Sequence, residues 1–315
     1  MAIRNVIIEV RRKPEFEASL LGASLSGAQA IAADAAAHSI AGLTIDHGFA
    51  PIPIPSGMAP DPSLGTATGA AAATDVALDD NSDRVWLRGT LDESQADASV
   101  LAAGTDDCRV YADPAIDSCL TCGNSPAKGT YQDVARQMGV AALHRAGRDG
   151  RGVLLAIVDT GISMAHLRSR GIEARLDESL SWTPPLQPGQ APMTPGQFSS
   201  NHGTMCAFDA LIGAPAATLL DIAVLASKRR GSSLIDGLLS DAILGYSHLL
   251  RVMRRMGRPG GYHSLVVSNS WGMFSQSWDF PPDHPGRSHL NSDHPQDRLQ
   301  VVQIPSGGAT LALNA

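Results

Sequence analysis

The pattern of apolar and polar positions changes near residue 113. Before that point, short stretches rich in β-branched residues alternate with alanine-rich and polar stretches. We expect strands at residues 4–11, 43–46, 84–90 and 108–112, and helices at residues 19–38 and 92–103. Strand, helix, strand, repeated once, is the order of a split βαβ module. Residues 1–113 are therefore predicted to form a small α+β domain.

A linker interrupts this domain at residues 50–75. Five prolines lie close together at its start, and a glycine- and alanine-rich stretch follows them. Proline has no backbone donor, and small residues bury little apolar surface. This stretch is therefore predicted to be a loop or a disordered linker.

Beyond a second linker at residues 114–129, helices and strands alternate. Amphipathic spacing predicts helices at residues 131–146 and 233–256, and nearly continuous apolar runs predict strands at residues 152–159, 217–225 and 263–270. Strands without a polar face are covered on both sides, as in parallel sheets. Residues 130–315 are therefore predicted to form an α/β domain with a doubly wound, mostly parallel sheet, whose functional residues gather at the carboxyl ends of the strands.

Composition excludes several classes of protein. The 315 residues include 24 Lys and Arg against 31 Asp and Glu, a net charge of −7, which argues against a nucleic-acid-binding surface. No apolar run approaches the ~20 residues that span a bilayer, so no membrane partner is expected. Arg4 and Glu9 interrupt the first apolar stretch, which argues against a secretory signal and favours the cytoplasm. Four cysteines are too few for a disulfide scaffold.

Two clusters contain residue types that bind metals. Cys119 and Cys122 have the spacing of a zinc-binding or redox pair, but no second pair at matching spacing completes a zinc site. An incidental linker pair, which could form a disulfide, is the favoured interpretation. Residues 273–296 contain three histidines among prolines and aspartates, and their irregular spacing favours a surface loop. We therefore predict no metal and no cofactor.

Three polar features follow strands or loops of the second domain. Asp159 ends the first apolar run, where a helix N-cap is the ordinary interpretation. His202 opens an alanine- and leucine-rich helix, and Gly203 leaves room for a close backbone approach; a lone histidine is more often an ordinary structural residue. Residues 270–272 end the third apolar run. They form either a plain turn or a backbone edge that pairs with an extended peptide.

Together these features resemble the motifs of subtilisin-like serine peptidases (subtilases). The resemblance rests on the segments Ile157-Val-Asp-Thr-Gly161, Asn201-His-Gly-Thr-Met205 and Ser268-Asn-Ser-Trp-Gly272. His202 follows Asp159 by 43 residues, and Ser270 follows His202 by 68. The resemblance implies that Asp159 orients His202 and that His202 is the catalytic base. It also implies that Ser270, Trp271 and Gly272 bind the substrate.

The resemblance extends to the first domain. Residues 1–113, as a ferredoxin-like α+β module, resemble the prodomain that often precedes such peptidases, where it is a folding chaperone and an inhibitor. The implied partners are a protein or peptide substrate and this intramolecular prodomain.

One catalytic motif of the family has no counterpart in this sequence. Subtilases carry their nucleophile in a Gly-Thr-Ser-x-x-x-Pro motif, and the Gly-Thr and Gly-Ser sites at Gly65, Gly203 and Gly231 do not fit it. Gly308 stands about where the family has the asparagine that stabilises the oxyanion. The resemblance therefore implies a serine endopeptidase that is truncated or inactive as given, because acyl-enzyme catalysis needs the serine.

Other interpretations stay open. A non-catalytic pseudoprotease could bind peptides through the groove around residues 270–272. An unrelated cofactor-binding protein is disfavoured, because the glycine-rich segment 147–152 precedes its strand and does not open a helix. A sheet that lacks its later strands would leave an edge unpaired, so we expect marginal stability or association through that edge.

Overall fold

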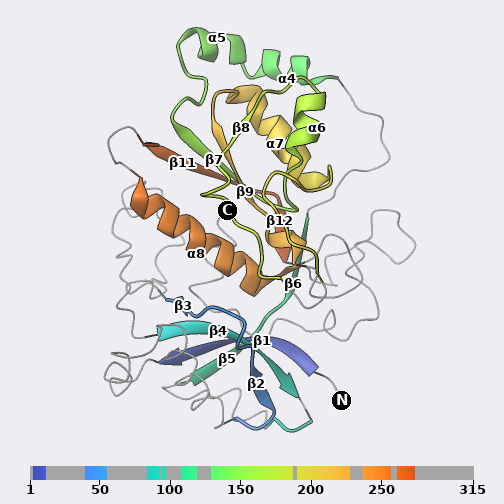
Figure 1. Ribbon diagram of the computed structural model, residues 1–315, viewed down its shortest axis with the longest axis vertical. Helices are drawn as coiled ribbons and strands as arrows, with labels where there is room; N and C mark the ends of the chain where they lie inside the picture. The colour runs from blue at the N-terminus through green and yellow to red at the C-terminus, as the bar shows by residue number, and fades with distance from the viewer. Residues whose placement is uncertain are drawn as a thin grey trace, which may run out of the picture. The chain divides into compact units, whose positions relative to one another are not determined.

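A computed structural model describes residues 3–11, 40–54, 84–92, 94–96, 108–118, 129–186, 190–227, 237–256 and 261–273 (Figure 1). The chain divides into two compact units. Among the described residues, those up to 114 form the first unit and those from 115 onwards form the second.

The first unit contains an antiparallel sheet. Its strands are β1 (Ile3–Arg11), β2 (Leu43–Ile45), β3 (Ile52–Pro53), β4 (Arg84–Asp92) and β5 (Cys108–Ala112). The order is β2-β4-β1-β5, with β3 also paired to β4, and every pairing is antiparallel. This is the order that a split βαβ module produces, and the four predicted strands are present.

Alternation of side chains along β1 builds the core of this unit. Val6, Ile8 and Val10 pack with Leu87, Leu91 and other apolar residues on one face. The predicted helix 19–38 and residues 55–75 of the predicted linker lie outside the described residues. The linker's Ile52 and Pro53 form β3. Of the predicted helix 92–103, Asp92 ends β4 and its side chain caps a turn at Ser94, and most of the remainder is outside the described residues.

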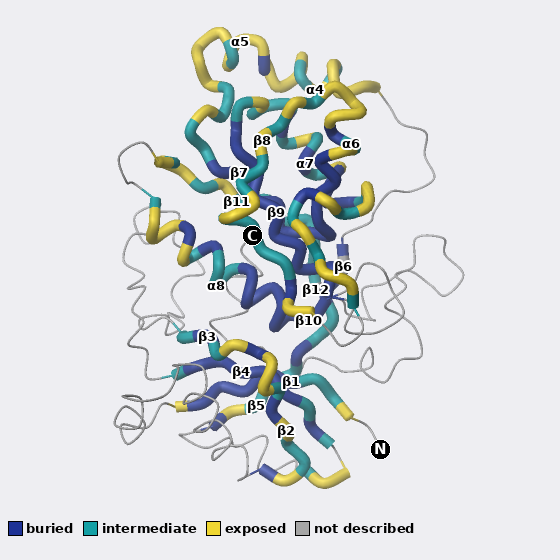
Figure 2. The backbone as a smooth tube through the Cα atoms, viewed as in Figure 1, coloured by how far each residue is buried: buried dark blue, intermediate teal, exposed yellow. Residues whose placement is uncertain are grey.

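The second unit contains a four-stranded parallel sheet. Its strands are β7 (Val153–Val158), β8 (Arg175–Leu176), β9 (Thr218–Ile222) and β11 (Ser264–Asn269), in the order β11-β7-β9-β8. All three pairings are parallel. β7 and β9 are almost wholly buried (Figure 2), as their continuous apolar runs predict.

Helices cover both faces of this sheet. On one face, α6 (Met164–Ser169) and α7 (His202–Gly213) pack against alternate residues of β7 and β9 that include Leu155 and Leu219. On the other face lies α8 (Leu239–Arg255), whose Gly245 lies against Ile222. Among the described residues the second unit is therefore an α/β layered structure, as predicted.

A smaller antiparallel sheet belongs to the same unit. It consists of β10 (Gly237–Leu238), β6 (Ala115–Ser118) and β12 (Trp271–Met273), with β6 in the middle. β6 is antiparallel to both neighbours, and Ile116 is fully buried between them. The sequence pattern did not predict this pairing, because β6 lies in the expected linker at residues 114–129.

Two helix predictions need correction. The helix expected at residues 131–146 is two helices, α4 (Tyr131–Gln137) and α5 (Val140–Arg145), because Gly139 between them adopts a left-handed φ of 66°. Val134, Met138 and Leu143, the expected apolar stripe, are exposed. The helix expected from residue 233 begins at Leu239, since Gly237 and Leu238 extend as β10.

Within the described ranges, no helix combines the length and the apolar composition needed to cross a bilayer.

Candidate active site

Asp159 lies at the carboxyl end of β7, in the middle of the parallel sheet. Its backbone N–H donates to the carbonyl of Ile222 at 3.0 Å, so the strand pairing continues up to this residue, and the side chain is fully buried. The following helix, α6, has Ser163 as its N-cap. The interpretation of Asp159 as a helix cap is therefore wrong, and a buried carboxylate here needs other partners.

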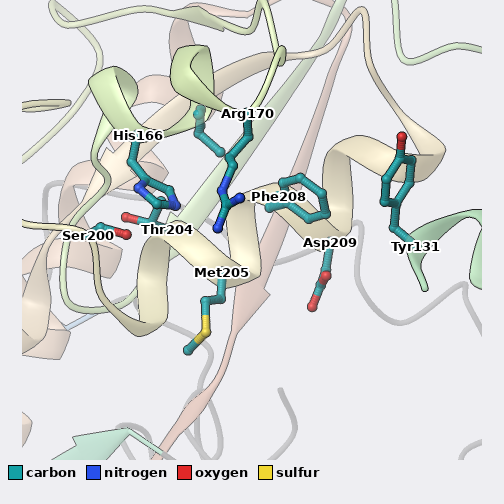
Figure 3. Close-up of a pocket in the computed structure, with 9 residues that line it drawn as sticks. Tyr131, His166, Arg170, Ser200, Thr204, Met205, Phe208 and Asp209 are labelled. Atoms are coloured by element: carbon teal, nitrogen blue, oxygen red, sulfur yellow. The ribbon is translucent and has the colours of Figure 1, made fainter. Parts of the chain in front are cut away.

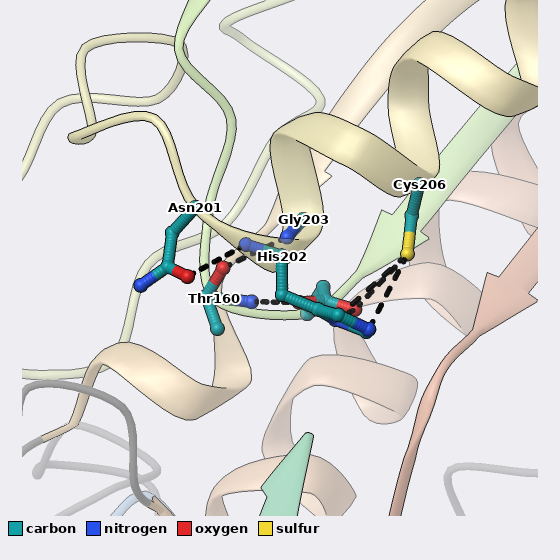
Figure 4. Close-up of polar contacts among 6 residues, drawn as sticks. Thr160, Asn201, His202, Gly203 and Cys206 are labelled. Carbon is teal, nitrogen blue, oxygen red and sulfur yellow. Dashed lines mark hydrogen bonds and ion pairs between the residues drawn. The ribbon is translucent and has the colours of Figure 1, made fainter. Parts of the chain in front are cut away.

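His202 supplies one of those partners. It is the first residue of α7, and the Asn201 side chain caps the helix by accepting the His202 N–H at 2.8 Å. The His202 Nδ1 lies 2.9 and 3.0 Å from the two carboxylate oxygens of Asp159 (Figure 4). Thr160 adds a backbone N–H donor at 2.7 Å. Asp159 and His202, which are 43 residues apart in the sequence, thus form one hydrogen-bonded pair. Only 9% of the His202 surface is exposed to solvent.

Close packing between two turns holds this pair together. A Cβ on Gly203 would lie 2.7 Å from the carbonyl oxygen of Gly161 and 3.1 Å from the Cβ of Asp159. The Gly203 N–H donates to the Thr160 hydroxyl at 2.9 Å. The Ser163 N–H donates to the Thr204 hydroxyl, also at 2.9 Å. The predicted need for a small residue after His202 is therefore explained by the Asp159 turn.

The pair has a defined chemical capacity. A carboxylate facing Nδ1 requires that nitrogen to carry a proton, so the neutral ring of His202 keeps its lone pair on Nε2. A buried carboxylate also stabilises the imidazolium that forms when Nε2 accepts a proton. The arrangement is therefore suited to general base catalysis at Nε2.

Cys206 is a site residue that the sequence reasoning missed. It lies one helical turn after His202, and its Sγ is 3.7 Å from Asp159 Oδ2 and 3.8 and 4.0 Å from the two ring nitrogens of His202. Burial raises the pKa of the Cys206 thiol, an effect that a hydrogen bond with Ser270 opposes and the charge of Asp159 reinforces. The signal was available, because residues at i and i+4 share one helix face.

Asp159, His202 and Cys206 are the described residues that could hold a metal ion. One ligand atom from each lies within 4.8 Å of the others. Two features oppose metal binding. His202 Nδ1 is already bonded to the carboxylate, and the raised pKa keeps the thiol in its protonated form. The geometry therefore favours a hydrogen-bonded cluster.

The structure brings one predicted substrate-binding residue close to the pair and places the other two in a paired strand. Ser270 directly follows β11, and its side chain hydrogen-bonds to Cys206. Trp271 and Gly272 lie in β12, opposite Ser118 and Asp117 of β6. The backbone edge predicted to accept an extended peptide is thus occupied by a strand of the same chain.

Asp221 is a second missed residue. It lies on β9, fully buried, and burial raises its pKa to about 7. The sequence placed it inside an apolar run, where a buried carboxyl group is unusual.

A cavity of about 500 Å³ lies beside α6 and α7 (Figure 3). Its lining includes His166 of α6, Arg170 directly after that helix, and Met205 and Phe208 of α7. Neither Asp159 nor His202 lines it, so this cavity is separate from the hydrogen-bonded pair. The predicted pair Cys119 and Cys122 lies outside the described residues, as does the histidine-containing loop beyond Met273.

Two comparisons with known proteins found no match. No family model matches the chain, and no curated protein matches it.

Proposed function

We propose that the second unit is the Asp–His part of a subtilisin-like serine endopeptidase domain. The observation that carries the proposal is the buried bond from His202 Nδ1 to Asp159, formed between the carboxyl end of a parallel strand and the first residue of a helix. The motif order and the parallel α/β sheet support the same family. On this proposal the first unit is the prodomain-like module.

Each residue then has a role in peptide-bond hydrolysis. Asp159 holds His202 in one tautomer and stabilises its protonated form. His202 Nε2 takes the proton from a serine hydroxyl and later gives it to the leaving amine. Ser270, Trp271 and Gly272 form one wall of the substrate groove.

The strand pairing of β6 supports a groove that binds extended peptides. β6 is antiparallel to both β10 and β12, so main-chain hydrogen bonds hold it on two sides. A peptide substrate adding to the same edges would make equivalent bonds. On this proposal Ala115–Ser118 takes the place that a substrate would occupy, and it directly follows the prodomain-like unit in the sequence.

The chain as given is proposed not to hydrolyse peptides by itself, because no segment matches the nucleophile motif. A fluorophosphonate probe, which labels activated serines, should leave the chain unlabelled. Labelling that maps to one of its serines would overturn this part of the proposal.

Competition for the groove tests the proposal directly. A fluorescent peptide that copies residues 112–118 should bind weakly to the wild type, because β6 fills the groove. Ile116→Ala removes buried contacts of β6 at a cost of about 2–5 kcal/mol, so peptide affinity should rise about tenfold or more in fluorescence anisotropy.

The matched control is Ile8→Ala, which opens a similar cavity at a fully buried isoleucine of the first unit. Peptide affinity should not change in this variant. Equal affinities for the wild type and Ile116→Ala would contradict a peptide groove at β6.

The alternative function is a non-catalytic peptide-binding pseudoprotease. The paired groove favours it as much as it favours the peptidase, and the missing serine motif is consistent with it. His202→Ala should leave peptide binding unchanged, because His202 is not part of β10 or β12. Hydrolysis of a peptide by the wild type that this variant lacks would favour the peptidase over the pseudoprotease.

A further inference from the structure

Asp221 occupies the centre of the parallel sheet, beneath the candidate site. In register it pairs with Ile157 of β7, two residues before Asp159. Side chains alternate along a strand, so Asp221, Ile157 and Asp159 all face the side covered by α7. The side chain of Asp221 is completely buried there.

One oxygen atom of Asp221 joins two separate segments. Its Oδ2 accepts the backbone N–H of Ile162 at 3.1 Å and the backbone N–H of Gly196 at 2.7 Å. Ile162 lies three residues after Asp159, and Gly196 lies six residues before His202. The two segments that deliver the reacting residues therefore share a single acceptor.

The two segments also pair with each other above this acceptor. The Met164 N–H donates to the Gly196 carbonyl at 2.8 Å, and the Phe198 N–H donates to the Ile162 carbonyl at 3.1 Å. A side chain on Gly196 would collide with Leu176 at 2.5 Å. The pairing is thus close-packed, and Asp221 is its link to the rigid sheet.

We propose that Asp221 is a positioning residue that ties the segment after Asp159 to the segment before His202, and so sets the alignment of the Asp159–His202 pair. An apolar residue at this position would leave two buried N–H groups without an acceptor, which is unfavourable for each of them. The two hydrogen bonds that Asp221 accepts are present in the structure whatever the protein does. Only the importance of the resulting alignment for catalysis rests on the proposed peptidase function.

The carboxyl group of Asp221 changes its protonation state near neutral pH. Burial and the nearby charge of Asp159 raise its pKa to about 7, while the two backbone hydrogen bonds act in the opposite direction. Its Oδ1 is buried, and no described group donates to it or accepts from it. Backbone N–H groups bond more strongly to a carboxylate than to a neutral acid, so both hydrogen bonds should change strength together as the carboxyl group ionises.

Several other charged or titratable side chains of the described residues lie on the elements that adjoin Asp221. The remaining charged or titratable side chains of the adjoining elements are His202, Cys206 and Asp209 on α7, His166 and Arg168 on α6, Arg170 directly after α6, and Arg175 and Asp177 beside β9. Asp159 is the charged group that shifts the pKa of Asp221.

Nuclear magnetic resonance of the full chain tests the proposal. In the wild type, the amide signals of Ile162 and Gly196 should titrate together with one midpoint near pH 7. Asp221→Asn keeps an oxygen acceptor and should abolish this titration while both amides stay protected from hydrogen exchange. Asp159→Asn should move the shared midpoint to lower pH, because it removes the neighbouring charge.

Asp221→Ala should speed exchange of both amides by about tenfold or more, and should shift or broaden the His202 Nδ1–H signal. Asp241→Asn is the control. This aspartate is also fully buried and accepts the Leu238 N–H at 3.1 Å, but it lies on α8 and should leave all three signals unchanged.

Two results would overturn the proposal. One is separate or absent titration of the two wild-type amides. The other is an unchanged His202 signal in Asp221→Ala. If Asp221→Ala does not fold, the loss of titration in Asp221→Asn decides the matter. Failure of the peptide-competition experiment would contradict the proposed peptide groove at β6 and would leave these signals unchanged.

Discussion

Replacement of Gly203 by alanine should separate the two halves of the candidate site. Gly203 has no left-handed backbone angle, so alanine meets no conformational strain at this position of α7. Glycine to alanine in a helix usually stabilises a protein by about 0.4–1 kcal/mol. Here the new methyl group would lie 2.7 Å from the Gly161 carbonyl oxygen and 3.1 Å from the Asp159 Cβ.

The size of the effect follows from these distances. Ordinary van der Waals contact begins at 3.4 Å, so the helix start must move away from the Asp159 turn by about 0.7 Å. Forcing one extra carbon into such a site costs about 1–3 kcal/mol. The sign of the stability change is therefore opposite to that of an unhindered helix position. The same movement lengthens the bond from His202 Nδ1 to Asp159, now 2.9 Å.

Urea unfolding and the His202 Nδ1–H resonance measure the two consequences. Gly203→Ala should lower the free energy of unfolding and shift or remove the resonance. Gly213→Ala is the control, since it lies in the same helix and its new methyl group would have no neighbour within 4 Å. It should be neutral or stabilising. A Gly203→Ala protein as stable as Gly213→Ala, with the resonance intact, would refute this account of the site.

Three further predictions follow from charge and exposure. The pKa of Asp221 is about 7 in the folded protein against 3.8 for the free group, so the folded state binds one more proton than the unfolded state between these two values. The free energy of unfolding should therefore fall by roughly 1.4 kcal/mol per pH unit as the pH rises from about 4 to 7. Asp221→Asn should lack this slope, and equal slopes for the variant and the wild type would contradict the prediction. The raised pKa of the Cys206 thiol should make its alkylation by iodoacetamide at pH 8 slower than that of an unfolded control, as followed by mass spectrometry; a faster reaction would indicate a thiolate. β11 ends the described parallel sheet and its Val266 is 52% exposed, so Val266→Lys should reduce concentration-dependent association in sedimentation velocity, and no change would show that this edge is not used.

Local patterns determined the elements that carry the candidate site. The apolar run before Asp159 forms β7, because a strand covered on both faces has no polar positions. His202 begins α7 because Asn201 is a good N-cap, and Gly203 leaves room for the Asp159 turn. Spacing and motif resemblance therefore identified two residues whose side chains meet, although 43 residues separate them.

Contacts between distant segments were decided by the tertiary structure alone. The spacing of four residues from His202 to Cys206 could be read from the sequence. The contact of the Cys206 thiol with Ser270, in contrast, depends on where β11 ends. Asp221 looked like a polar residue in an apolar strand, and its role as a shared acceptor depends on two loops that pack over it. The segment of β6 was predicted to be part of a linker, and it is a strand because its backbone pairs with β10 and β12. A sequence encodes burial and periodicity within a segment, whereas a buried polar group finds its partners only when segments remote in the chain are folded together.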